Sequence, residues 1–129
     1  MIVVDSSVWI DYFNGTPTPE VDRLDGYLVS EPILIGDLVL AEVLQGFRHD
    51  TDHELARSAL SQLASAPMVG LDVAYRSAEN FRALRRRGIT VRKTIDCLIA
   101  TFCLHHGHAL LFSDRDFLPF VDHLGLVPA

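Results

Sequence analysis

The feature that most constrains this chain is its start, where an apolar run passes through a single acid into a helical pattern. Residues 1–4 read MIVV, a run rich in β-branched valine and short enough for a buried strand. Asp5 ends the run, and the two serines that follow are typical of a helix start. Four apolar residues then recur at the i, i+1, i+4, i+5 spacing of one helix face: Val8, Trp9, Tyr12 and Phe13. A strand that ends on a carboxylate at a strand-to-helix turn places Asp5 where ligands bind in open α/β sheets.

Length and composition limit the class of protein. With 129 residues the chain is long enough for its own core, and we expect a single domain over residues 1–129. We expect a cytoplasmic protein, because no apolar run reaches the ~18 residues of a membrane span and the start resembles no signal peptide. Cys97 and Cys103 point about 240° apart around one predicted helix, so both are expected to be buried free thiols. The net charge of −6 argues against a nucleic-acid partner unless basic residues gather locally.

Strand and helix patterns alternate along the rest of the chain. Further strands are predicted at residues 33–35, 67–71 and 109–112, with a last edge strand at 126–127. Helices are predicted from Thr18 to Pro32, from Asp37 to Phe47, over 51–65, from Asp72 to Arg87 and from Thr94 to His106, with one or two turns over 117–124. In the helix after Asp72, three residues are expected to face the core: Ala74, Ala78 and Phe81. The alternation predicts an α/β fold with a mostly parallel sheet of four to five strands.

Four acidic residues are expected at one edge of this sheet. Asp5 ends the first predicted strand and Asp114 follows the fourth, so parallel strands would bring both to the same edge. Asp96 lies in the first turn of its helix, and Glu42 lies among apolar neighbours in the helix after the second strand. Each acid alone has an ordinary structural explanation as a helix-dipole partner, a turn residue or a solvated side chain. Their coincidence, with Asp116 two residues beyond Asp114, favours a common site.

Clustered carboxylates predict a divalent cation, because like charges a few ångströms apart repel and raise one another's pKa. Since the candidate ligands are all oxygens, Mg²⁺ or Mn²⁺ is favoured over Zn²⁺. Such ions activate water in line with a phosphodiester bond and stabilise the leaving oxygen. The alternative zinc ligands would be His105, His106 and His108. We interpret these histidines as a helix C-terminus before Gly107, since no paired cysteine ligands lie nearby.

Four segments together resemble the PIN-domain family, and more narrowly its VapC toxins: VVDSSVWIDYF, DLVLAEVLQGFR, TIDCLIA and LLFSDRDF. The segments cover nearly the whole chain. The resemblance implies a three-layer PIN-like sandwich and a metal-dependent endoribonuclease with catalytic acids at Asp5, Glu42, Asp96 and Asp114. It implies that Mg²⁺ or Mn²⁺ is bound by Asp5, Asp96, Asp114 and Asp116. Ser7 and Ser113 match hydroxyl positions that the family often uses to hold the acids.

The same resemblance implies protein partners. Family members are inhibited by a small antitoxin, VapB, whose tail fills the catalytic groove, and they usually form homodimers. The residues themselves also predict a surface for binding a protein partner. Apolar side chains of the third and fourth predicted helices exceed what a small core needs, among them Leu44, Phe47 and Leu55. We expect some of them to line a groove for an antitoxin helix.

Basic residues gather just before Asp96. Six of the eleven Lys and Arg residues fall within twelve positions: Arg82, Arg85, Arg86, Arg87, Arg92 and Lys93. One explanation is a solvated helix end that complements the helix dipole. The other is a strip that binds RNA phosphates beside the acids, with Arg85, Arg86, Arg87, Arg92 and Lys93 as its contacts. The second explanation reconciles a negatively charged protein with an RNA substrate.

Two other functions fit the sequence less well. A phospho-acceptor signalling domain also places acids at strand ends with Mg²⁺, but it needs an adjacent acidic pair after the first strand and a lysine after a late strand. The chain has Asp5-Ser6 and Ser113-Asp114 at these places. A non-catalytic PIN-like scaffold is disfavoured because all four acids are present. The sequence therefore predicts a Mg²⁺- or Mn²⁺-dependent endoribonuclease that acts as the toxin of a type II toxin–antitoxin pair.

Overall fold

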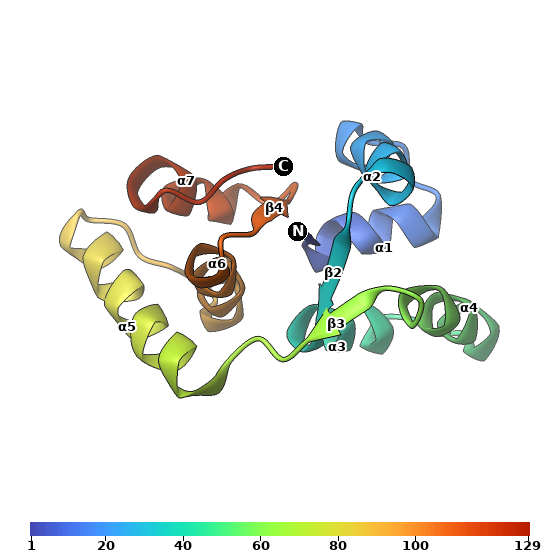
Figure 1. Ribbon diagram of the computed structural model, residues 1–129, viewed down its shortest axis with the longest axis horizontal. Coiled ribbons are helices and arrows are strands. Elements are labelled where there is room, and N and C mark those ends of the chain that lie inside the picture. Colours follow the sequence, from blue (N-terminus) through green and yellow to red (C-terminus); the bar gives the residue numbers. More distant parts are fainter.

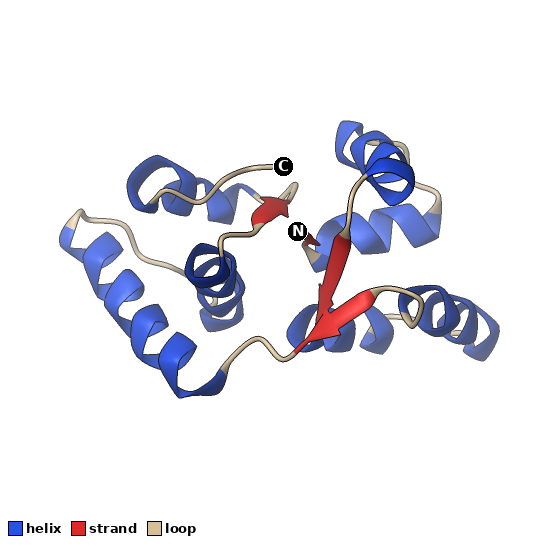
Figure 2. Ribbon diagram, in the orientation of Figure 1, coloured by secondary structure: helices blue, strands red, loops and turns tan.

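A parallel four-stranded sheet forms the centre of the molecule, with helices on both sides (Figures 1 and 2). The computed structural model describes all 129 residues. The strands, in the spatial order β3-β2-β1-β4, are β1 (Ile2–Val4), β2 (Ile33–Gly36), β3 (Ala64–Ala66) and β4 (Ala109–Leu111). Val4 lies opposite Leu111 in the register of β1 and β4, and the amide of Asp5 donates to the Leu111 carbonyl at 2.9 Å. The chain therefore leaves β1 and β4 at the same edge of the sheet.

Seven α-helices and one 3₁₀ turn surround the sheet. They are α1 (Ser6–Asn14), α2 (Pro19–Ser30), α3 (Asp37–Gln45), α4 (Asp50–Leu60), α5 (Gly70–Arg86), α6 (Thr94–His106), η1 (Arg115–Phe117) and α7 (Leu118–Leu124). Helix α1 packs against α2 and α3, whereas α5 packs against α6 and α7. Figure 1 shows α5, α6 and α7 on one side of the strands, with α1, α2 and α4 on the other. None of these helices is both long and apolar enough to cross a membrane.

The helix boundaries follow from local capping chemistry. Thr18 accepts a hydrogen bond from the Val21 amide, and Pro19 occupies the first position of α2, as predicted. Helix α6 ends at Gly107, whose φ of 71° lies in the left-handed region that glycine adopts readily. At the start of α3, α5 and α6 the predicted cap was wrong by one to three residues. These helices start after Gly36, Val69 and Lys93.

Apolar side chains from the sheet and the inner helix faces form one core. Strand β2 is buried along its whole length, and the C-terminal segment contributes Phe117, Phe120 and Leu126. Cys97 and Cys103 are both free and buried, as predicted. Burial raises the pKa of the Cys103 thiol to about 12, so it remains protonated near neutral pH.

The sequence misplaced the third strand. It was predicted at residues 67–71, but β3 comprises Ala64–Ala66, and α4 ends at Leu60 rather than at residue 65. Met68, read as part of the strand, enters the core against Gly36. A Cβ atom on Gly36 would lie 2.1 Å from the Met68 sulfur, so any larger residue at this position would force the Met68 side chain to move. The predicted edge strand at 126–127 is reduced to a single parallel bridge between Leu110 and Pro128.

The buried face of α5 also differs from the prediction. The fully buried residues are Val73, Ser77 and Leu84, whereas Ala74 and Ala78 are exposed. Phe81, the third residue of the predicted face, is half-buried. All three residues line a hollow between α5 and α6, and of the three only Phe81 also packs against the core.

Candidate active site

The shared edge of β1 and β4 begins with Asp5, which joins β1 to α1 and is 4% exposed. The Ser7 hydroxyl donates to Asp5 Oδ2 at 2.7 Å, and the Ser7 amide donates to the same oxygen at 3.4 Å. Ser7 Oγ also lies 3.2 Å from Ser113 Oγ. A pair of hydroxyls therefore links the residues that follow β1 with those that follow β4. The two residues predicted to support the acids, Ser7 and Ser113, thus lie in contact beside Asp5.

Three acids converge beside this hydroxyl pair. Asp96, in the first turn of α6, and Asp114 and Asp116, after β4, each offer a carboxylate oxygen, and these oxygens lie within 4.8 Å of one another. The Asp116 amide donates to Asp114 Oδ1 at 2.9 Å, which fixes the turn that carries both residues. Three oxygen ligands at this spacing can hold one divalent cation.

Asp96 is the most strongly perturbed acid of the group. It is 6% exposed, and its Oδ2 is buried without a hydrogen-bond partner. Burial raises the pKa of Asp96, the charges of Asp5, Asp114 and Glu42 add to the rise and Lys93 opposes it, so that the pKa is about 6. A buried carboxylate oxygen without a partner is unfavourable, and a bound cation would satisfy it. The chemistry of this donor set therefore fits a divalent metal.

Glu42 and Asp5 lie beside the three-acid cluster. Burial raises the pKa of Glu42, the charge of Asp5 adds to the effect, and the nearby Ser6 hydroxyl and Lys93 oppose it. Glu42 Oε1 is also buried without a partner. Burial raises the pKa of Asp5 as well, and its bonds to Ser7 partly offset that rise. The structure thus brings the four predicted catalytic acids to one edge. Asp5, also predicted as a metal ligand, lies next to the close group of Asp96, Asp114 and Asp116 and is not a member of it.

Two basic residues pair with the acids, an arrangement that the sequence did not predict. Arg92 Nη2 lies 2.9 Å from Asp116 Oδ1, and Lys93 Nζ lies 3.7 Å from Asp114 Oδ2. Both cations belong to the segment between α5 and α6, and Lys93 is the N-cap residue of α6. Of the predicted RNA-binding strip, these two residues are the ones in contact with the acids. The other three, Arg85, Arg86 and Arg87, form the exposed end of α5.

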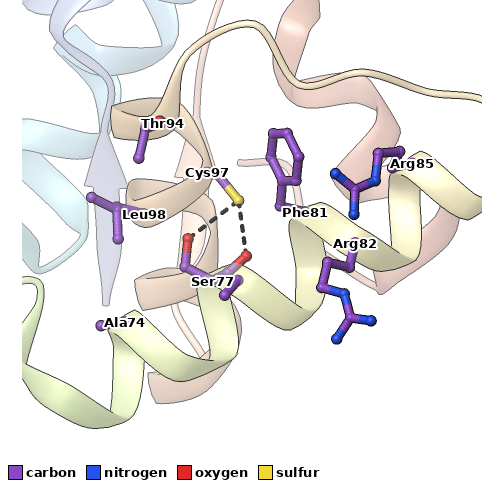
Figure 3. A pocket seen from close by; sticks show the side chains of 9 residues that line it. Ala74, Ser77, Phe81, Arg82, Arg85, Thr94, Cys97 and Leu98 are labelled. Atoms are coloured by element: carbon purple, nitrogen blue, oxygen red, sulfur yellow. Dashed lines mark hydrogen bonds between the residues drawn. The ribbon is translucent and has the colours of Figure 1, made fainter.

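A separate hollow of about 600 Å³ lies between α5 and α6 (Figure 3). Its lining residues are Ala74, Ser77, Ala78, Phe81, Arg82, Arg85, Thr94, Cys97 and Leu98. None of the predicted acids lines it, although Thr94 and Cys97 flank Asp96 in the sequence. Ser77 and Cys97 join its walls, because the Ser77 hydroxyl donates to the Cys97 sulfur at 3.3 Å. Figure 3 shows Arg82 and Arg85 at the opposite end of the hollow from Ala74.

One acid at a strand end does not belong to the site. Asp37 follows β2, and its Oδ1 accepts hydrogen bonds from the amides of Leu38 at 2.8 Å and Met68 at 3.0 Å. It was predicted as the N-cap of α3, but it is the first residue of that helix. The amide of Met68, 31 residues away in the chain, makes Asp37 a tie between α3 and the segment after β3.

The three histidines do not form a comparable cluster. They lie around the C-terminal end of α6, where the rings of Phe102 and His106 are 4.7 Å apart between centroids. The ring of His108 lies 5.6 Å from that of Phe102. Their ligand atoms do not converge as those of Asp96, Asp114 and Asp116 do.

The sequence matches a known protein family over most of its length. The PIN domain family model matches residues 2–120. VapC ribonuclease Mb1587 of Mycobacterium bovis and Ribonuclease VapC11 of Mycobacterium tuberculosis are each 33% identical over 122 residues, which cover 91% of this chain and 89% of theirs.

Solved structures share the fold. The structure of VapBC2 from Rickettsia felis, bound to a promoter DNA fragment, contains a chain with a TM-score of 0.79 and 19% identity, covering 100% of this chain and 98% of that one. A chain of FitAcB from Neisseria gonorrhoeae has a TM-score of 0.74 and 18% identity, covering 100% and 97%. On the family model and the sequence relatives, this chain belongs to the PIN-domain family, among its VapC ribonucleases.

Proposed function

We propose that this chain is a metal-dependent endoribonuclease that acts as the toxin of a type II toxin–antitoxin pair. The observation that carries the proposal is the convergence of Asp96, Asp114 and Asp116, with a buried and unpartnered oxygen on Asp96. The relatives that share a third of its sequence are named as ribonucleases. The oxygen-only donor set favours Mg²⁺ or Mn²⁺ as the ion.

The chain's own residues divide the chemistry between them. Asp96, Asp114 and Asp116 would hold the ion, together with Asp5, which Ser7 orients. A bound divalent ion supplies charge stabilisation at the phosphate and lowers the pKa of water. Glu42 would act as the general base and accept a proton from water, a role supported by its Oε1, which is buried and has no partner. The raised pKa of Glu42 favours such proton transfer near neutral pH.

RNA would reach the acids along the basic strip. Arg92 and Lys93 lie at the acids, and Arg85 lines the α5–α6 hollow together with Thr94, which precedes Asp96 by two residues. Arg86 and Arg87 extend the strip along the exposed end of α5. Their phosphate contacts would supply most of the affinity for RNA, which should therefore fall steeply with salt.

A VapB-type antitoxin is the protein partner that we propose. A further structural neighbour, with a TM-score of 0.74 and 20% identity, is a toxin–antitoxin complex from Klebsiella pneumoniae. On this chain, Leu55 of α4 is 66% exposed, and Leu44 lines a hollow between α3 and α4 with Leu60 and Leu63. An amphipathic antitoxin helix could bury these side chains. Phe47 contributes less, since it is half-buried against Phe13. Co-expression with the adjacent small open reading frame tests the pairing.

We also propose that the chain forms a homodimer, as its family resemblance implies. Helix α5 carries exposed apolar side chains that a second copy could cover, since Leu71 is 77% and Tyr75 is 70% exposed. Sedimentation of the free protein measures the oligomeric state directly. A monomer at micromolar concentration would contradict the proposal.

Cleavage of RNA by matched variants tests the enzymatic proposal. Wild type should cut a structured RNA with Mn²⁺ and lose this activity in EDTA. Asp96→Asn should lose at least about a hundredfold of the rate, because the metal site contributes several kcal/mol to transition-state stabilisation. Asp37→Asn is the matched control, since Asp37 lies after a neighbouring strand and bonds only to backbone amides. Equal cleavage by wild type and Asp96→Asn, or cleavage that persists in EDTA, would contradict the assignment.

A further inference from the structure

Arg92 and Lys93 form ion pairs with acids that would bind the metal ion, so they affect how the ion binds. Each cation pairs with a different acid of the three-acid cluster, Arg92 with Asp116 and Lys93 with Asp114. Oδ1 of Asp114 already accepts the Asp116 amide, whereas Oδ2, the oxygen that Lys93 faces, has no other polar contact. A divalent cation among these acids therefore meets two positive side chains already present.

The side chains of both basic residues are free to move away from their acids. The side chains of Arg92 and Lys93 are 76% and 58% exposed, and neither lies within a helix. Ion pairs at such exposed positions are weak, because water screens the charges and long side chains lose entropy when they are held. A phosphate of bound RNA can therefore take Arg92 or Lys93 from its acid without disturbing the fold.

We propose that Arg92 and Lys93 are tethered counter-ions that compete with the divalent metal for Asp116 and Asp114, and that RNA phosphates release them. The proposal deepens the ribonuclease function proposed above and rests on it. Without RNA the two side chains neutralise the acids and weaken metal binding. With RNA they turn to phosphates and leave the carboxylates to the ion. Metal and RNA then favour each other's binding by the same factor, as thermodynamic linkage requires.

Titration of the RNA-free protein with Mn²⁺ tests the competition. Arg92→Gln and Lys93→Gln should each bind Mn²⁺ roughly threefold to tenfold more tightly than wild type, because a positive charge beside the ion is removed. Lys93→Arg keeps the charge and should bind as wild type does. Arg76→Gln is the matched control, since Arg76 is an exposed arginine that lines a hollow with Leu104 and His105, at the far end of α6 from Asp96. It should leave the Mn²⁺ affinity unchanged.

The release by RNA needs a second titration. A 2′-O-methyl phosphorothioate oligonucleotide, checked for integrity afterwards, should tighten Mn²⁺ binding to wild type by roughly the factor gained in the Gln variants. In the double variant Arg92→Gln/Lys93→Gln the same oligonucleotide should give little further gain. Far-ultraviolet circular dichroism verifies that each variant is folded.

The outcomes separate this inference from the proposed function. If wild type binds Mn²⁺ and cuts RNA, but the Gln variants bind Mn²⁺ no more tightly, the counter-ion role is wrong and the ribonuclease assignment stands. Weaker Mn²⁺ binding by the Gln variants would overturn the inference too, because it would mean that the cations only support the site. If wild type binds no Mn²⁺ and cuts no RNA, both proposals fail.

Discussion

Two neighbouring strand-to-helix junctions carry an aspartate each, and they use it in opposite ways. At the end of β2, Asp37 accepts two backbone amide hydrogen bonds, from Leu38 and Met68, and so ties α3 to the segment after β3. At the end of β1, Asp5 lies beside the charges of Asp114 and Asp96, and two carboxylate oxygens nearby have no partner. The comparison teaches that an acid bonded only to backbone amides belongs to the fold, whereas an acid that also faces other acids indicates a site, even where it accepts an amide as Asp5 and Asp114 do.

The largest difference between the site acids and Asp37 should be in the stabilisation of their variants by added metal. Mn²⁺ should stabilise the wild type by RT ln(1 + [L]/Kd), about 2.7 kcal/mol at a hundredfold excess over Kd. Asp37→Asn should gain as much, because its acid lies outside the cluster, and Asp96→Asn should gain far less. Differential scanning fluorimetry with EDTA and with Mn²⁺ measures the shifts. An equal gain in Asp96→Asn would mean that the cation binds elsewhere.

A substitution that disturbs the packing at the β2–α3 junction should have the next largest effect. Gly36→Ala places a Cβ against the fully buried Met68 and should destabilise the protein by about 2 kcal/mol. The control is Gly26→Ala in α2, where nothing lies within 4 Å of the new Cβ and the better helix propensity should stabilise by up to about 1 kcal/mol. Urea unfolding measures both. A Gly36→Ala protein as stable as wild type would show that Met68 relaxes freely.

The pH dependence of the metal-free protein should report Asp96. Its pKa rises from 3.8 to about 6 on folding, so protonation favours the folded state. This contribution is fully present below about pH 4 and is lost as the pH rises through 6, with a total of about 2 kcal/mol after allowance for solvent screening. Asp96→Asn should remove that slope and melt higher than wild type at pH 7.5 in EDTA. Asp37→Asn should instead lower the free energy of unfolding by about 1 kcal/mol, because the hydrogen bonds from backbone amides to this side chain weaken.

The smallest effect should come from the hydroxyl that holds Asp5. Ser7→Ala removes the 2.7 Å hydrogen bond to Asp5 Oδ2, which should destabilise the protein by about 1 kcal/mol and raise the pKa of Asp5 further. Carbon-detected NMR titration of the Asp5 carboxyl follows the change. Ser61→Ala is the control, because it removes an exposed hydroxyl that bonds only to near neighbours in the sequence, donating to the Ser58 carbonyl and accepting from the Gln62 side chain. A pKa of Asp5 that does not rise in Ser7→Ala would contradict the role of this bond.

The sequence predicted what local chemistry determines. The buried run before Asp5, the cap at Thr18 and the stop at Gly107 all follow from short-range rules, and the structure confirms them. Three of the acids could be found because Asp5 and Asp114 follow paired parallel strands and Glu42 lies in the helix that follows β2. Asp96 could be found from its place in the first turn of α6, which follows α5 and not a strand.

Tertiary contacts determined the features that the sequence did not predict. The residues of β3 are Ala-Ser-Ala, which have little strand propensity, whereas the more apolar segment around Met68 resembles a strand but packs against Gly36. Ser77 is buried because it bonds to Cys97 across α5 and α6, so a polar residue takes the place that Ala78 was expected to fill. The ion pairs of Arg92 and Lys93 depend on the path of the segment before α6, for which the sequence carries no periodic signal.

Anomalous diffraction from a crystal of the protein soaked in Mn²⁺ would test the central claim most directly, because it locates the ion itself. The account predicts an anomalous peak within coordination distance of carboxylate oxygens of Asp96, Asp114 and Asp116, on the side facing Asp5 and Glu42. The same soak of Asp96→Asn should give a weaker peak or none. A peak at the histidines of the α6 C-terminus, or no ordered ion in the wild type at millimolar Mn²⁺, would contradict the account.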